Sequence, residues 1–65
     1  MMRYSIPDMT CGHCKKAVET ALQELDAQAQ IRVDLEKREV ELQSSAPADQ
    51  IVAALKTAGY EASPL

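Results

Sequence analysis

Two cysteines separated by two residues, in the segment Met9-Thr10-Cys11-Gly12-His13-Cys14, are the residues of this chain best suited to chemistry. A thiolate is a nucleophile, a redox centre and a ligand for soft metal ions. A closed structural zinc site needs four ligands, whereas the chain offers two cysteines and one histidine. The pair therefore indicates either an open site for a soft ion of low coordination number, Cu(I) above all, or a redox pair of the Cys-x-x-Cys type.

The segments on either side of the motif must position the two thiols. Apolar residues alternate over residues 2–6, which predicts a strand that ends at Pro7, and residues 8–13 read as a loop. From Cys14 to about residue 27 the apolar period is helical, with Thr10 as the expected N-cap. Both thiols would then lie near unpaired backbone N–H groups and the positive end of a helix dipole, which lower a thiol pKa. Lys15 and Lys16 either add to that positive charge or are ordinary solvated side chains.

The rest of the chain completes a small α+β pattern. Residues 29–35 and 39–43 alternate as strands around a polar turn at 34–38. Ser45 is the expected cap of a second helix, with Pro47 in its first turn and Gly59 at its end, and residues 60–64 are left for a last strand. The order βαββαβ predicts a two-layer sandwich, in which two helices cover one face of an antiparallel sheet. We expect a single domain over residues 1–65.

Composition excludes several classes of function. A chain of 65 residues has little room for a substrate cleft, so we expect no enzyme. The net charge of −3 and the absence of Trp and Phe argue against nucleic acid as a partner. No apolar run is long enough for a membrane span, and no secretory signal is visible, so the chain is expected to be cytoplasmic and not membrane-embedded. In a reducing compartment, two cysteines are not expected to form a structural disulfide.

Three further residues are candidates for auxiliary roles at the cysteine pair. Met9 could supply a thioether ligand, but a methionine beside such a loop is expected to pack inward. His13 could be a third ligand, a proton acceptor or simply a solvated side chain at a helix start. Tyr60 follows the second helix, whose C-terminal end should lie on the side of the cysteine loop, and it could also be a partly buried packing residue.

The motif Met-Thr-Cys-Gly-His-Cys after a short strand, followed by helix, hairpin, helix and Ala58-Gly59-Tyr60, resembles the heavy-metal-associated domain family. Over essentially the whole chain it is similar to the bacterial cytosolic copper chaperones of that family. The resemblance implies a ferredoxin-like βαββαβ fold, Cu(I) bound by Cys11 and Cys14, and a place for Tyr60 beside the thiolates. It also implies delivery of the ion to the metal-binding domain of a copper-transporting P-type ATPase. The family usually has glycine before the methionine, where this chain has Asp8.

Several alternatives remain open from the sequence. Cys11 could be the nucleophile of a thiol–disulfide oxidoreductase, although no thioredoxin-like context surrounds it. The chain could be a copper buffer that delivers to no partner, or a mercury-type carrier of the same fold. Exposed cysteine pairs can also share copper between chains, so a copper-bridged homodimer is a further expectation.

Overall fold

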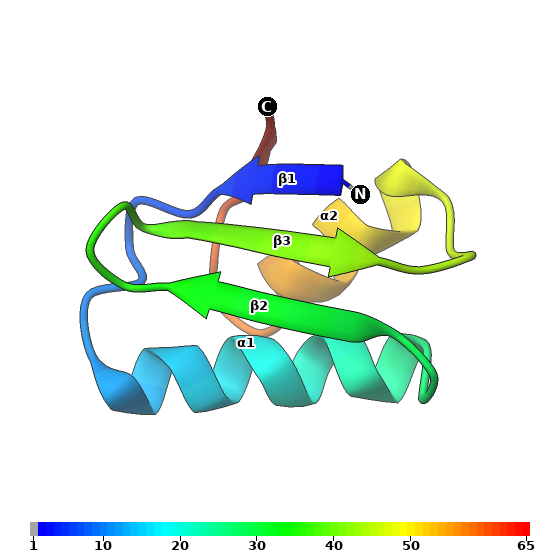
Figure 1. Ribbon diagram of the computed structural model, residues 1–65, viewed down its shortest axis with the longest axis horizontal. Coiled ribbons are helices and arrows are strands. Elements are labelled where there is room, and N and C mark those ends of the chain that lie inside the picture. The colour runs from blue at the N-terminus through cyan, green and yellow to red at the C-terminus, as the bar shows by residue number, and fades with distance from the viewer. Residues whose placement is uncertain (1) are drawn as a thin grey trace.

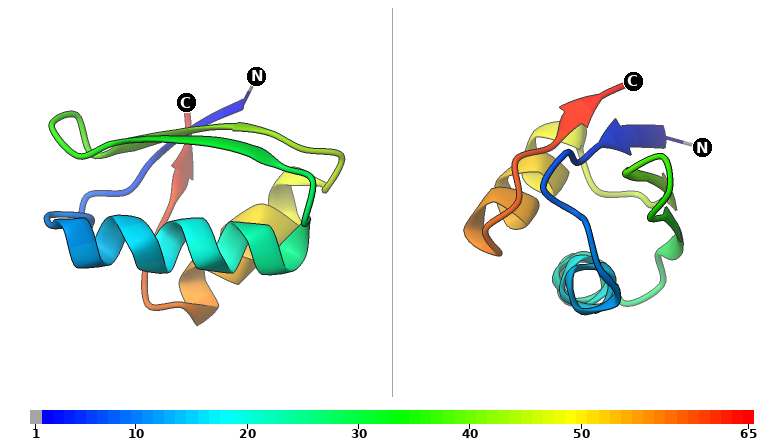
Figure 2. Two further views of the ribbon diagram at one scale, coloured as in Figure 1. Left: turned by 60° about the horizontal axis from the view of Figure 1, so that its bottom comes forward. Right: turned by 90° about the vertical axis from the view of Figure 1, so that its left-hand side faces the viewer.

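The computed structural model describes residues 2–65. The elements follow the order β1 (Met2–Ser5), α1 (Gly12–Leu25), β2 (Gln30–Asp34), β3 (Glu39–Gln43), α2 (Ala48–Thr57) and β4 (Ser63–Pro64). The strands form one antiparallel sheet in the order β2-β3-β1-β4 (Figure 1). Both helices lie against the same face of this sheet, as Figure 2 shows. This arrangement confirms the predicted ferredoxin-like βαββαβ fold.

The core lies between the sheet and the two helices and is almost entirely aliphatic. β1 and β3 pair in a register that sets Tyr4 opposite Val40 and Met2 opposite Leu42. Alternation along a strand sends these side chains to one face, where Val18 and Leu22 of α1 and Ile51 and Leu55 of α2 meet them. The buried set is Tyr4, Ile6, Met9, Val18, Leu22, Val40, Leu42, Ile51 and Leu55. Ile31 and Val33 lie on the edge strand β2 and are only partly buried.

The start of α1 differs from the prediction. The helix begins at Gly12, and Cys11 is the N-cap, with extended φ and ψ of −148° and 169°. The N–H of Lys15 donates to the carbonyl of Cys11 over 3.1 Å, which is the first helical hydrogen bond. Thr10 therefore stands one residue before the cap, and the expectation that it caps α1 was wrong. The Cys11 side chain makes no capping bond, because its sulfur is directed toward Cys14.

The entry to α2 also differs. Pro47 is the N-cap rather than a residue of the first turn, and no side chain caps the helix, so the prediction of Ser45 as cap was wrong. The two serines before the helix instead meet Asp26, which follows α1. Ser44 Oγ donates to Asp26 Oδ2 over 2.6 Å, and the Ser45 N–H donates to the same oxygen over 3.4 Å. A contact between segments 18 residues apart is not readable from local propensity.

Two hydrogen bonds tie the cysteine loop to the sheet. The Ile6 N–H donates to the Arg38 carbonyl over 2.8 Å, which joins the end of β1 to the turn between β2 and β3. The Met9 N–H donates to the Ile6 carbonyl over 3.0 Å, closing a turn around Pro7 and Asp8. Because Ile6 and Met9 are both fully buried, the chain is anchored on the core just before it reaches Cys11. Neither helix of residues 2–65 is long and apolar enough to span a bilayer.

Candidate metal site

The two cysteines meet at the N-terminus of α1. Cys11 is exposed and Cys14 is half-buried, and both are free thiols. Their sulfurs lie 3.3 Å apart, with the Cys11 thiol placed to donate to the Cys14 sulfur. Cys11 is the N-cap of α1 and Cys14 is its third residue. These two positions lie on the same side of the first turn, so the spacing of three residues brings the two side chains together. The pair is thus a preformed, solvent-accessible dithiol.

The environment of Cys14 favours its thiolate form. Hydrogen bonds lower the pKa of Cys14 from 9.0 to about 7. The largest contribution comes from the Tyr60 hydroxyl, followed by the backbone N–H of Thr10 and then the Cys11 thiol. Each is a donor that stabilises a negative sulfur more than a protonated one. Close to neutral pH, a large fraction of Cys14 is therefore ready to act as a ligand or a nucleophile.

Tyr60 reaches this site because of how α2 ends. Ala58 is the C-cap, and Gly59 has a φ of +98°. The Gly59 N–H donates to the Lys56 carbonyl over 2.9 Å, and the Tyr60 N–H donates to the Leu55 carbonyl over 2.9 Å. This pair of bonds is a Schellman motif, which reverses the chain immediately after the helix. The reversal turns Tyr60 toward α1, where the neighbouring Cys14 raises the pKa of the tyrosine hydroxyl.

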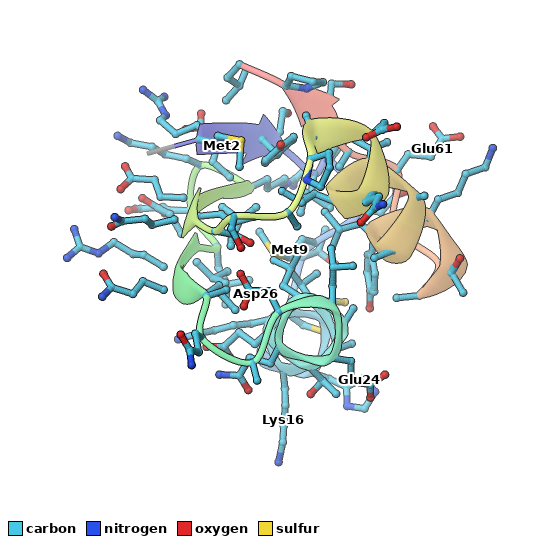
Figure 3. All side chains as sticks on the ribbon, turned by 90° about the vertical axis from the view of Figure 1, so that its right-hand side faces the viewer. Met2, Met9, Lys16, Glu24, Asp26 and Glu61 are labelled. Carbon is cyan, nitrogen blue, oxygen red and sulfur yellow. The ribbon has the colours of Figure 1, made fainter. Side chains whose placement is uncertain are left out.

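The other two candidate residues differ in exposure. The side chain of Met9 is fully buried in the core between the sheet and the helices, as predicted (Figure 3). His13 is exposed and lines a groove between α1 and α2 together with Lys16 and Thr57. Within residues 2–65, no three His, Cys, Asp or Glu side chains gather as a metal-binding group. The described residues therefore provide two sulfur ligands for an ion, on a side of the molecule that is open to solvent.

Such a site suits a soft ion that accepts two ligands and exchanges them readily. Two sulfurs on opposite sides of one ion would be about 4.6 Å apart if each metal–sulfur bond were about 2.3 Å. The 3.3 Å separation would have to widen by about 1.3 Å for an ion to be held between the sulfurs in this way. Cys11 can provide this movement, because it is exposed and its side chain makes no capping bond. Lys15, Lys16 and Asp8 are also exposed near the loop.

The expected backbone N–H groups beside the thiols are found at Cys14, where the amides of Thr10 and Cys11 both lower the pKa. Which amides would reach the sulfur could not be predicted, because nearly every residue carries an N–H. The role of Gly59 had a signal, since glycine after a helical pattern favours a left-handed C-terminal residue. Its consequence for Tyr60 depended on where α2 ends relative to α1.

Comparison with known proteins identifies the family. Residues 3–61 match the model of the heavy-metal-associated domain. The chain is 42% identical over 64 residues to the COP-associated protein of Helicobacter felis, covering 92% of this chain and 97% of the relative. It is 37% identical over 60 residues to the copper chaperone CopZ of Staphylococcus aureus, with 88% of each chain covered. The chain belongs to the heavy-metal-associated domain family.

Solved structures agree in fold. A gold binding protein superimposes with a TM-score of 0.97 at 40% identity, and the match covers all of both chains. The copper chaperone Atx1 from Synechocystis PCC6803 superimposes with a TM-score of 0.94 at 35% identity, covering 97% of this chain and all of that one. One of these two relatives is named for gold and the other for copper, and both of these metals form soft ions.

Proposed function

We propose that this protein is a copper chaperone that carries Cu(I) between the thiolates of Cys11 and Cys14. The observation that carries the proposal is the pair of free sulfurs 3.3 Å apart at an exposed helix N-terminus, one of them with its pKa lowered to about 7. Thiolates prefer Cu(I) among abundant cellular ions, and two ligands leave the ion accessible to exchange. The related chaperones are carriers of metal rather than enzymes, which supports the same role here.

Delivery is part of the proposal. An ion held by two exposed thiolates can pass to a partner that presents its own pair of thiolates, through shared coordination at the open side. The recipient that we propose is the metal-binding domain of a copper-transporting P-type ATPase. We also propose a cytoplasmic location, because two free cysteines this close together persist as thiols in a reducing compartment. A copper-bridged homodimer would use the same two sulfurs from each of two copies.

The test is a titration of the reduced protein with Cu(I) in competition with a chelator, with native mass spectrometry to count bound ions. We expect one tightly bound Cu(I) per chain and much weaker binding of Zn(II), because zinc prefers four ligands. Cys11→Ser combined with Cys14→Ser should abolish binding and leave the circular dichroism spectrum unchanged, because neither sulfur lies in the buried core. Zinc binding as tight as copper binding would refute the assignment of the metal.

The gold binding relative supports a second candidate cargo. Au(I) is also a soft ion suited to two thiolates, and the similarity covers the whole chain at 40% identity. Competition between Cu(I) and Au(I) for the dithiol under the same chelator conditions would rank the two ions. A protein that retains Au(I) and releases Cu(I) at equal free concentrations would be a gold carrier.

A further inference from the structure

The side of α1 that faces away from the sheet forms one wall of a groove separate from the dithiol. The groove has a volume of about 610 Å³, and its second wall is the C-terminal half of α2, through Ala54, Thr57 and Ala58. Figure 3 shows Lys16 and Glu24 projecting from α1 on this side. The α1 residues that line the groove are His13, Lys16, Ala17, Thr20, Ala21, Glu24 and Leu25.

These α1 residues fall in two rows with a spacing of four residues. The inner row is His13, Ala17, Ala21 and Leu25, and its two alanines leave a shallow channel. The outer row is Lys16, Thr20 and Glu24, which forms a ridge beside the channel. Rows of this spacing are the ridges and grooves by which helices pack on one another. The surface therefore has the form of a helix-packing face to which no further helix is docked.

The outer row carries one positive and one negative side chain, and their positions indicate which helix could pack against this surface. Lys16 lies four residues before Thr20, and Glu24 lies four residues after it. If a second α1 is laid antiparallel across the first with Thr20 at the two-fold axis, Lys16 of each copy opposes Glu24 of the other. A two-fold interface must be complementary to itself in this way. The antiparallel arrangement also aligns the two helix dipoles favourably.

The monomer leaves both charges available for such an interface. Within residues 2–65 the salt bridge formed is that of Arg3 with Glu39, on the opposite face of the sheet. The first turn of α1 contains no acidic residue and its last turn no basic residue. Glu24 of a second copy would bring a negative charge beside the N-terminal half of α1, where the helix alone lacks one.

We propose that this groove is a self-association surface, through which two copies form a metal-independent antiparallel dimer centred on Thr20. Cys14 lies six residues from the axis, so the two Cys14 residues would be about 18 Å apart along the helices at about 1.5 Å per residue. No single ion or small cluster bridges sulfurs at that distance. This dimer differs from a copper-bridged one, and each subunit retains an open dithiol at the outer end of the assembly.

Sedimentation of reduced, chelator-treated protein from about 20 µM to about 2 mM, the range in which small interfaces associate, tests the proposal. We expect a dimer whose dissociation constant rises with salt. Glu24→Lys alone should raise that constant by at least about tenfold, because two exposed pairs change from attraction to repulsion. Combining it with Lys16→Glu should restore association. Lys15→Glu is the matched control, since Lys15 does not line the groove.

A second measurement maps the two-fold axis. In a Cys11→Ser, Cys14→Ser background, Thr20→Cys should form an intermolecular disulfide on oxidation, whereas Lys15→Cys should not. A protein that stays monomeric over the whole concentration range, or that associates only with copper, would overturn the proposal. So would a charge-swapped double variant that associates no better than Glu24→Lys.

Discussion

Gly59 is expected to control both the stability of the fold and the reactivity of the dithiol. Its φ of +98° is a conformation that side-chain-bearing residues rarely adopt. A Cβ built on Gly59 meets no atom within 4 Å, so Gly59→Ala introduces backbone strain and no steric clash. Placing an L-residue at such a φ costs about 1–2 kcal/mol of folding free energy. For a domain of this size, that loss lowers the melting temperature by about 5–15 °C.

The chain provides a matched control for this substitution. Gly12 is the first residue of α1, and a Cβ there also meets no atom within 4 Å. Its φ is not positive, so Gly12→Ala makes the same chemical change without the strain. Alanine favours a helix more than glycine by up to about 1 kcal/mol. Gly12→Ala should therefore melt at the same temperature as the parent protein or somewhat above it.

Two measurements follow from Gly59→Ala. Thermal unfolding by circular dichroism should show Gly59→Ala melting below the parent and Gly12→Ala melting with the parent or above it. The pH dependence of alkylation should show the pKa of Cys14 rising from about 7 toward 9.0, because a disturbed turn withdraws the Tyr60 hydroxyl. A Gly59→Ala protein that melts with the parent would refute the strain argument. One that melts lower but keeps the Cys14 pKa would show that the turn does not position Tyr60.

Three further substitutions test separate parts of the structure. Tyr60→Phe should raise the pKa of Cys14 above 7 with little change in melting temperature; a melting change alone would make Tyr60 a packing residue. Asp26→Asn should destabilise the fold, because hydrogen bonds from Ser44 and from backbone amides lower the pKa of Asp26 below its ordinary 3.8. That contribution is present above 3.8 and is lost as the pH falls through the lowered pKa, so the stability difference from the parent should shrink in acid urea titrations. Lys15→Glu should slow copper transfer to an ATPase metal-binding domain, most at low salt, without changing copper stoichiometry, as stopped-flow kinetics would show.

The local physics of the sequence determined most of the architecture. Alternation over the strands and a helical period between them are strong signals in a chain this short, and they gave the correct order of elements. The spacing of Cys11 and Cys14 indicated one dithiol next to a helix start, because neighbouring positions of a first turn lie on one side. Gly59 marked the end of α2 through its tolerance of positive φ.

Tertiary structure decided what the local signals could not. The cap of α1 is Cys11 rather than Thr10, because the turn anchored by buried Ile6 and Met9 fixes where the chain enters the helix. The pairing of Asp26 with Ser44 replaced the expected serine cap, since it joins segments distant in sequence. The effect of the Tyr60 hydroxyl on the pKa of Cys14 likewise needs α2 to end beside α1. Hydrogen bonds of this kind depend on the packing of whole elements, and no pattern of neighbouring residues contains that information.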